Sequence, residues 1–432
     1  MEESKFQSII KKAYITLLLV IFGGILLHTP VSIGLGVLFP DFGLLIKSWK
    51  EILMAIAGLM AIYLLIKKKQ LKLLTEPIIL LIGVYAILHL VLSMFFNDSL
   101  TPKSAGLLID LRYVLFFGLV YIALKMWPNY RNLFLKVGLA GAIIVVTFAL
   151  LQIFILPKDI LKYIGYGPSS ISSYMTVDQN PDFIRINSTL RGPNPLGAYM
   201  VIILSVLLAF FCKFRSKMDK QKNVIILALI FGGMITLWFS YSRSAIVAAV
   251  LAVFIVIIIS FLEKIALKRI VLGAVGVLLI SVVGVFVLFG NSYFVSNVLL
   301  HQNPSEDKSI NSNEGHINSL QTGFNLLIIQ PFGGGIGSTG SASLYGIQPI
   351  IIENQYLFIA HEVGWLGLGL FISIFGLIIF SLWNRRKDWL ALGVLASGIG
   401  LAVIGLLLPV WVDDTVSIVW WGLAAIALVN KK

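Results

Sequence analysis

Residues 224–261 read VIILALIFGGMITLWFSYSRSAIVAAVLAVFIVIIISF, and Arg243 is the one charged residue among them. A helix that crosses a bilayer needs roughly 20 mostly apolar residues, so this stretch is long enough for two spans. A charge in the middle of a bilayer is costly unless it is paired. We therefore predict two membrane helices joined by a tight hairpin, with Arg243 at the membrane surface.

The whole chain of 432 residues has a similar composition. It is 58% hydrophobic and only 12% charged, whereas a soluble domain is usually about one-quarter charged. The apolar residues stand in long unbroken blocks, which must face lipid as well as each other. This composition excludes a soluble enzyme, a disordered chain and a DNA-binding protein. The single cysteine, Cys212, excludes an internal disulfide and a cysteine-rich metal site.

We predict an all-α polytopic membrane protein, with about twelve transmembrane helices in a single domain over residues 1–432. The first span is followed directly by others and by no small-residue cleavage site, so it is not a removable signal. The predicted spans are about 13–30, 49–66, 76–96, 104–125, 132–156, 195–212, 223–241, 244–262, 270–289, 353–382, 389–409 and 412–430.

The basic residues orient these spans. With both termini in the cytoplasm, most of the 33 lysine and arginine residues lie on the inner side, as the positive-inside rule requires. The net charge of +13 is then a consequence of topology and does not indicate nucleic acid. Two outer segments, about 157–194 and 290–352, are long, and long loops are usually functional. We expect the working face of the protein there.

Three arginines stand on the outer side against this bias, namely Arg185, Arg191 and Arg243. An arginine at membrane level is a functional hypothesis by default, and the alternative is snorkelling towards lipid headgroups. The planar guanidinium group binds phosphate oxygens in pairs, so three such groups suit a diphosphate.

Other polar residues fall inside or beside the predicted spans. Arg112 is either a further phosphate contact or a lock inside the helix bundle. Asp110 does not share a helix face with Arg112, and we expect it in a salt bridge between helices. The remaining expectations are His28 and His89 as packed or lipid-facing residues, His361 and Glu362 as internal pairs, and Asp413 and Asp414 as a solvated pair.

The second outer segment contains a predicted amphipathic helix. Residues 317–328 carry apolar side chains at helical spacing, which is typical of a helix lying across the mouth of a bundle. His316 stands at the start of this helix. The stretch PFGGGIG at 331–337 either brings backbone N–H groups towards an anion or forms a flexible turn. It is not a nucleotide P-loop, because the lysine and the preceding strand are lacking.

Glu353 opens the tenth predicted span at the lipid–water boundary. Partial desolvation there suits a carboxylate to act as a general base. The alternative is an acid at a helix N-terminus, favoured by the helix macrodipole. No group of residues in the sequence has metal-ligand spacing, so we expect no metal.

Four motifs follow each other in the chain. They are RINSTLRGPNP from Arg185, SRSA from Ser242, PFGGGIG from Pro331 and ENQYLFIAHEVGWLG from Glu353. Together with the twelve-span plan, their order resembles the O-antigen ligase and O-antigen polymerase superfamily of bacterial surface-polysaccharide assembly. By motif, the resemblance covers about residues 180–370.

The resemblance implies a multi-pass protein of the bacterial inner membrane that acts as an inverting glycosyltransferase. Its donor would be a glycan on undecaprenyl diphosphate, already on the outer side of the membrane. Outer arginines would hold the diphosphate leaving group and a base would deprotonate the acceptor hydroxyl, without a metal or cofactor. The implied partners are this lipid-linked oligosaccharide, membrane lipid and other polysaccharide-assembly proteins, and no nucleic acid.

The resemblance also assigns roles to single residues. Arg185 or Arg191 matches the family's arginine before the Pro-Asn element, and Arg243 matches the Ser-Arg turn. His316 stands where the family commonly has an arginine at the head of the amphipathic helix. By this likeness the arginines contact the substrate.

Glu353 stands where ligases carry a histidine before an asparagine, here Asn354. The ten residues between Glu353 and Gly364 keep the separation that the family has. The catalytic base is therefore either Glu353 or His316, with Asn354 as a substrate contact. A carboxylate can perform the same proton transfer as a histidine.

The exchange of histidine for Glu353 favours a polymerase of O-antigen or capsule-type repeat units over a ligase that moves finished glycan to a different acceptor. A transporter or flippase of lipid-linked oligosaccharide is a third hypothesis, from another class. It predicts paired broken spans with charges near the bilayer midplane. Most of the unexpected charges here are instead predicted at the outer boundary, which disfavours transport.

Overall fold

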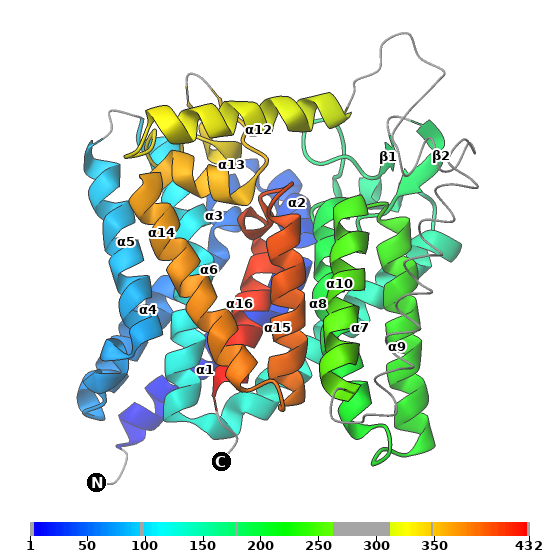
Figure 1. The fold of residues 1–432 in the computed structure, drawn as a ribbon, viewed down its shortest axis with the longest axis horizontal. Coiled ribbons are helices and arrows are strands. Elements are labelled where there is room, and N and C mark those ends of the chain that lie inside the picture. The colour runs from blue at the N-terminus through cyan, green and yellow to red at the C-terminus, as the bar shows by residue number, and fades with distance from the viewer. Residues whose placement is uncertain (1–3, 96–98, 178–179, 262–311, 347–348, 430–432) are drawn as a thin grey trace. The chain divides into compact units, whose positions relative to one another are not determined.

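The computed structural model describes residues 4–95, 99–177, 180–261, 312–346 and 349–429 (Figure 1). The chain divides into two compact units, and each is described by itself. Unit 1 consists of Met1–Ala142, Ser319–Asn384 and Gly405–Lys432. Unit 2 consists of Ile143–Asn318 and Arg385–Ile404.

Nine helices in the described part of the chain are long and apolar enough to cross a membrane. Two further apolar helices, α15 (Trp389–Ile404) and α16 (Asp414–Leu428), are shorter. Each predicted span corresponds to one of these helices, except the one at about 270–289, which lies outside the described residues. The prediction of a multi-pass α-helical membrane protein is confirmed at this level, while its orientation stays a prediction.

Unit 1 is built around α6 and α16, which are its most buried helices. Aromatic rings join them, with centroid separations of 5.1 Å for Tyr113–Trp421 and 6.1 Å for Phe117–Trp421. The elements of this unit, besides α16, are α1 (Lys5–Gly24), η1 (Ile25–Leu27), α2 (His28–Leu38), η2 (Pro40–Phe42), α3 (Gly43–Lys47), α4 (Trp49–Lys67), η3 (Leu71–Thr75), α5 (Pro77–Phe95), α6 (Leu100–Met126), η4 (Pro128–Tyr130), α13 (Gly340–Ser343), α14 (Gln355–Asn384) and η7 (Val410–Val412). Helix α7 (Arg131–Phe154) continues from unit 1 into unit 2, and α12 (Ser312–Ile329) belongs to unit 1 from Ser319 onward.

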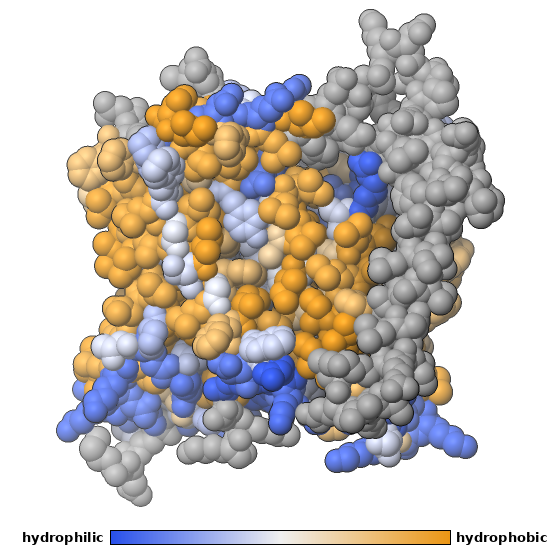
Figure 2. Space-filling model, in the orientation of Figure 1, coloured by the Kyte–Doolittle hydropathy of each residue, from blue (hydrophilic) through white to orange (hydrophobic). Residues whose placement is uncertain are grey.

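The surface of unit 1 follows the pattern of a membrane protein. Hydrophobic side chains cover the length of α5 and α14, and hydrophilic ones gather at the ends of these helices (Figure 2). At one end, the ammonium groups of Lys11 and Lys68 lie 5.9 Å and 5.6 Å from the Trp127 ring centroid. These three residues come from segments predicted to share the inner side, and the structure does bring them together.

Unit 2 is built around α8 (Pro193–Phe214), which packs against α9 (Lys220–Phe239), α10 (Arg243–Phe261) and α15. The predicted hairpin at Arg243 is confirmed, because only residues 240–242 separate α9 from α10. The first long outer segment contains η5 (Ile160–Ile164) and a small antiparallel sheet of β1 (Met175–Val177) and β2 (Asn180–Arg185). This sheet is an addition to the all-α prediction.

Helix α14 is broken at Gly364, where φ is 66° and ψ is −171°. The sequence pattern predicts one continuous span here. The segment 331–337 fills the break, because the Trp365 N–H donates to the Pro331 carbonyl at 2.9 Å and the Gly334 N–H donates to the His361 carbonyl. A Cβ atom on Gly333 would lie 2.8 Å from the Gly364 nitrogen. The glycine-rich segment 331–337 is therefore packed into the break of α14 and is not a flexible turn. We call this segment the plug.

The predicted amphipathic helix is confirmed as α12, whose C-terminal half lies across the end of α14 (Figure 1). The indole N–H of Trp365 donates to the Leu327 carbonyl at 2.7 Å. A Cβ on Gly323 would lie 3.1 Å from Leu357. Helix α12 is thus fixed to both parts of the broken α14.

Replacing Gly364 by alanine should destabilise the protein by at least about 3 kcal/mol, because a side chain is strained at this φ. Its Cβ would also lie 2.7 Å from the Phe332 carbonyl carbon. The matched control is Gly369→Ala in the same helix, where nothing lies within 4 Å of the new Cβ, and a gain of about 0.5–1 kcal/mol is expected. Thermal unfolding in detergent measures both. Equal midpoints for the two variants would contradict the plug.

Candidate functional site

The three outer arginines lie at the starts of two helices of unit 2. Arg185 ends β2, and its Nε donates to the Ser240 carbonyl at 2.9 Å while its Nη2 donates to Asn194 Oδ1 at 2.6 Å. Ser240 belongs to the turn before α10, and Asn194 belongs to the first turn of α8. Arg185 therefore ties the two helix starts to each other.

The N-termini of α8 and α10 lie in direct contact. A Cβ on Gly197 would lie 2.7 Å from the Ala245 Cβ and 2.9 Å from the Ser242 Cβ. Arg243 is the first residue of α10, and Arg191 is exposed just before α8 begins. Each helix N-terminus carries about half a positive charge and presents unpaired N–H groups. The fold thus gathers the three predicted arginines around two positive helix ends.

The loop that carries Arg191 is held firmly. Ser188 has a positive φ of 50°, which is uncommon for a residue other than glycine. Its N–H donates to Gln152 Oε1 at 2.7 Å and its hydroxyl donates to the Val145 carbonyl at 2.7 Å. The Ser-Thr element of the first motif therefore anchors this loop to α7.

The turn before Arg243 has a similar anchor. Tyr241 also has a positive φ, 48°, and its ring packs against Phe183 and Phe239 with centroid separations of 6.2 Å in both cases. Burial raises the pKa of the Tyr241 hydroxyl above its ordinary value. The turn is held by aromatic packing and presents an uncharged phenol beside the arginines.

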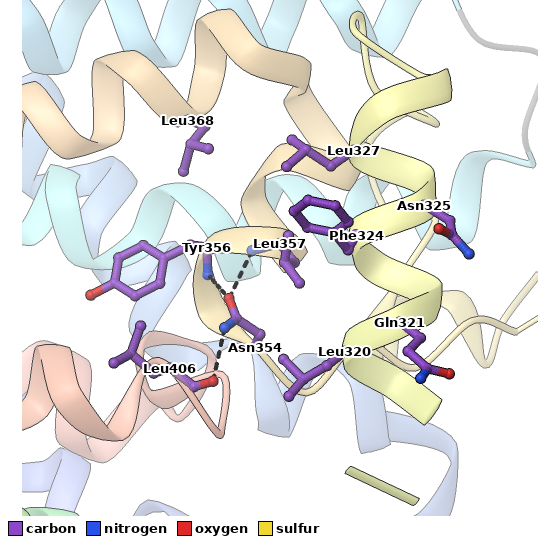
Figure 3. Close-up of a pocket in the computed structure, with 10 residues that line it drawn as sticks. All are labelled: Leu320, Gln321, Phe324, Asn325, Leu327, Asn354, Tyr356, Leu357, Leu368 and Leu406. Atoms are coloured by element: carbon purple, nitrogen blue, oxygen red, sulfur yellow. Dashed lines mark hydrogen bonds between the residues drawn. The ribbon is translucent and has the colours of Figure 1, made fainter. Parts of the chain in front are cut away.

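Unit 1 contains a cleft of about 740 Å³ that is lined in part by Asn354, the residue after Glu353 (Figure 3). Leucine and phenylalanine side chains of α12 face leucines of α14. Asn354 and Tyr356 lie beside these leucines, whereas Gln321 and Asn325 point away from them (Figure 3). A cleft with apolar walls and few polar groups is typical of small-ligand sites. Its lining residues are Leu320, Gln321, Phe324, Asn325, Leu327, Asn354, Tyr356, Leu357, Leu368 and Leu406.

Glu353 and Asn354 directly precede α14. The Asn354 side chain makes three hydrogen bonds, since Oδ1 accepts from the Tyr356 and Leu357 N–H groups and Nδ2 donates to the Leu406 carbonyl at 2.8 Å (Figure 3). Its geometry is that of a cap on α14, and its substrate contact stays a prediction. Glu353 is half-buried, and its backbone N–H donates to Ser319 Oγ at 2.9 Å.

Arg112 is 8% exposed and lies inside unit 1. Its Nη2 donates to the Val412 carbonyl, and its Nη1 is 3.9 Å from Glu51 Oε1. Of the two roles that the sequence left open, this geometry favours the lock inside the bundle over the phosphate contact.

The expectation of a solvated pair at Asp413 and Asp414 is wrong. Asp414 Oδ2 lies 3.1 Å from Lys50 Nζ and 3.1 Å from His28 Nε2, with 13% of its side chain exposed. The Asp413 side chain accepts from the Val416 N–H and caps α16. The partners of Asp414 come from α2 and α4, two distant helices. The local sequence around the two acids does not reveal them.

The carboxylate of Glu362, which the sequence analysis expected only in an internal pair, is buried. It accepts hydrogen bonds from the Gly337 N–H at 3.0 Å and the Thr339 N–H at 3.3 Å. Asp110 lies close by, because a Cβ on Gly106, one helical turn earlier in α6, would lie 2.5 Å from the Gly337 nitrogen. The signal in the sequence is two acids within apolar helices whose nearest basic residues do not share their helix face.

Comparison with models of protein families and with characterised proteins finds no match to this chain. The resemblance to the O-antigen ligase and polymerase superfamily therefore stays a prediction. His316 is in α12, but its side chain lies outside the described residues. Among the residues that the structure describes, no three His, Cys, Asp or Glu side chains are grouped to hold a metal ion.

Substitution of Asn354 tests whether its side chain caps α14 or contacts the substrate. Asn354→Ala removes three hydrogen bonds and should destabilise the protein by about 1–3 kcal/mol. Asn354→Asp keeps both acceptor bonds to the helix N-terminus and should lose less. Unfolding midpoints of the purified variants measure the difference. Unchanged stability of both variants would speak against the cap.

Proposed function

We propose that the protein is an inverting glycosyltransferase that uses a glycan on undecaprenyl diphosphate as its donor. We further propose that it polymerises O-antigen or capsule-type repeat units on the outer face of the bacterial inner membrane. The observation that carries this proposal is the gathering of Arg185, Arg191 and Arg243 around the N-termini of α8 and α10.

A diphosphate suits this group of positive charges. Guanidinium groups bind phosphate oxygens in pairs, and helix N-termini bind phosphate through backbone N–H groups. A hydrogen bond between charged partners contributes about 1.5–3 kcal/mol, less where water competes. The same contacts strengthen as negative charge develops on the leaving group, so they favour the transition state.

The proposed reaction is a single displacement at the anomeric carbon. An acceptor hydroxyl oxygen forms a bond to this carbon while the bond to the diphosphate oxygen breaks with its electron pair. Undecaprenyl diphosphate leaves, and the carboxylate of Glu353 takes the hydroxyl proton. Attack opposite the leaving group inverts the anomeric configuration. The position of Glu353 supports this role, because it is half-buried and directly precedes Asn354, which lines a largely apolar cleft.

Purified protein incubated with a synthetic undecaprenyl-diphosphate repeat unit tests the proposal. A ladder of lengthened glycans on a gel supports a polymerase. Transfer of the glycan only to a different acceptor indicates a ligase, which the likeness also allows. Movement of the donor across vesicle membranes without any new glycosidic bond would overturn the proposal in favour of a transporter.

Arg191→Ala and Arg243→Ala should each lower kcat/KM by roughly tenfold to a hundredfold, the equivalent of one charge-assisted hydrogen bond. The glycan ladder from each variant measures the effect. The control is Lys162→Ala, which removes an exposed cation of the same outer segment that pairs with Asp159. Normal ladders from both arginine variants would refute their role.

Glu353→Gln should lower kcat by roughly 10²–10⁴, the usual contribution of a general base, while donor binding is retained. Single-turnover assays and donor-binding measurements separate the two. Glu76→Gln is the control, since Glu76 pairs with Lys125 and Tyr121 and has no proposed role in turnover. If Glu353→Gln keeps full activity, the base is His316 or another group.

A further inference from the structure

Three helices of unit 1 bring three titratable side chains together in the protein interior. His89 lies on α5, Asp110 on α6 and Glu362 on α14, and they are 0%, 6% and 1% exposed. None of them belongs to the proposed reaction. Buried ionisable groups within membrane helices are uncommon and usually have a function.

The hydrogen bonds of this group determine where its protons are. A Cβ on Gly106, one helical turn before Asp110 in α6, would lie 2.5 Å from the Gly337 nitrogen, and the Gly337 N–H donates to Glu362, so the fold places the Asp110 and Glu362 side chains beside each other. Two ionised carboxylates repel each other in the interior and have only acceptor atoms, so a contact between them needs one proton. Both oxygens of Glu362 already accept a backbone N–H, from Gly337 and from Thr339. This favours Glu362 as the acceptor and Asp110 as the proton donor.

His89 provides an independent observation. Its Nδ1 is 2.9 Å from the Tyr85 carbonyl oxygen, which only accepts, so Nδ1 carries a hydrogen. In the neutral ring, Nε2 is then an acceptor. It has no hydrogen-bond partner among the described residues, and it lies 3.8 Å from Asp110 Oδ2. A buried, unpartnered acceptor is thus directed at the carboxyl pair.

The other polar groups around the pair are the hydroxyls of Tyr85 and Tyr113 and the guanidinium of Arg112. Arg112 donates to the Val412 carbonyl and lies close to Glu51. The hydroxyls are neutral donors. Arg112 already interacts with the Val412 carbonyl and Glu51. The shared proton is therefore the direct link between the carboxyl groups of Asp110 and Glu362.

A chain of hydrogen bonds leads from this pair to Glu353. Thr339, held by Glu362 through its N–H, donates its hydroxyl to the Ile350 carbonyl at 2.9 Å and accepts the Ile352 N–H at 3.2 Å. Ile352 is 1% exposed and directly precedes Glu353. The position of Glu362 therefore determines where the segment Ile350–Glu353 enters α14.

We propose that Asp110 and Glu362 bind one shared proton, and that this protonated pair positions Glu353 through Thr339. Glu362 is a positioning residue, not a catalytic one. The effect on turnover rests on the proposed function, whereas the binding of the proton does not.

Infrared difference spectroscopy of the purified protein tests the shared proton without any substrate. A protonated carboxyl group has a carbonyl band that carboxylates and amides lack, and the band shifts in D₂O. Relative to the unchanged protein, we expect Asp110→Asn to lose one such band and Glu362→Gln to shift or lose it. Asp41→Asn, which alters an exposed carboxyl of unit 1, is the control and should lose none. No loss in either cluster variant would overturn the proposal.

The turnover of Asp110 variants tests whether the carboxyl pair positions Glu353. Asp110→Asn retains a donor to Glu362 and should keep kcat within about threefold, whereas Asp110→Leu should lose more than about tenfold. Asparagine cannot lose its proton, so activity of Asp110→Asn should persist to higher pH than that of the unchanged protein. Equal losses in both variants, or an unaltered pH profile in Asp110→Asn, would overturn the positioning role.

The two proposals fail in different ways. If the unchanged protein makes no glycan from the lipid-linked donor, the proposed function fails, and the infrared bands still decide whether the proton is shared. If the ladder forms but the bands are unaltered, the proposed function stands and the shared proton is refuted.

Discussion

The break of α14 at Gly364 is the constraint on which the arrangement of unit 1 depends. A helix interrupted inside a membrane leaves backbone N–H and C=O groups without partners, and lipid offers none. Here the segment 331–337 supplies them through Pro331 and Gly334. Because backbone must approach backbone this closely, a side chain at Gly333 or Gly364 has no room.

The same break determines where the neighbouring residues lie. Glu362 stands just before it and holds the end of the plug by two N–H groups, and Trp365 stands just after it and holds α12. The cleft between α12 and α14 and the start of the segment that leads to Glu353 both follow from these contacts. In our proposal, the candidate base Glu353 is positioned by the buried carboxylate of Glu362 in α14.

In unit 2, several positive groups are held close to each other. Two helix N-termini repel, and arginines beside them add to the repulsion. Small residues bring α8 and α10 into contact at Gly197, and Arg185 connects both helix starts through an amide and a carbonyl oxygen. Aromatic packing of Tyr241 against Phe183 and Phe239 holds the turn before Arg243.

The sequence by itself determined the apolar helices, the hairpin at Arg243 and the amphipathic helix α12, because hydrophobic length and periodicity are local properties of a chain. It also singled out the three arginines that the fold gathers. The tertiary structure alone decided the partners of the buried polar groups: Glu362 with the Gly337 and Thr339 N–H groups, Asp414 with Lys50, and Arg112 with the Val412 carbonyl. These partners come from distant helices, and a buried charge is stable only where packing brings a complementary group within reach. The local sequence around a buried charge does not show which distant residue will lie next to it.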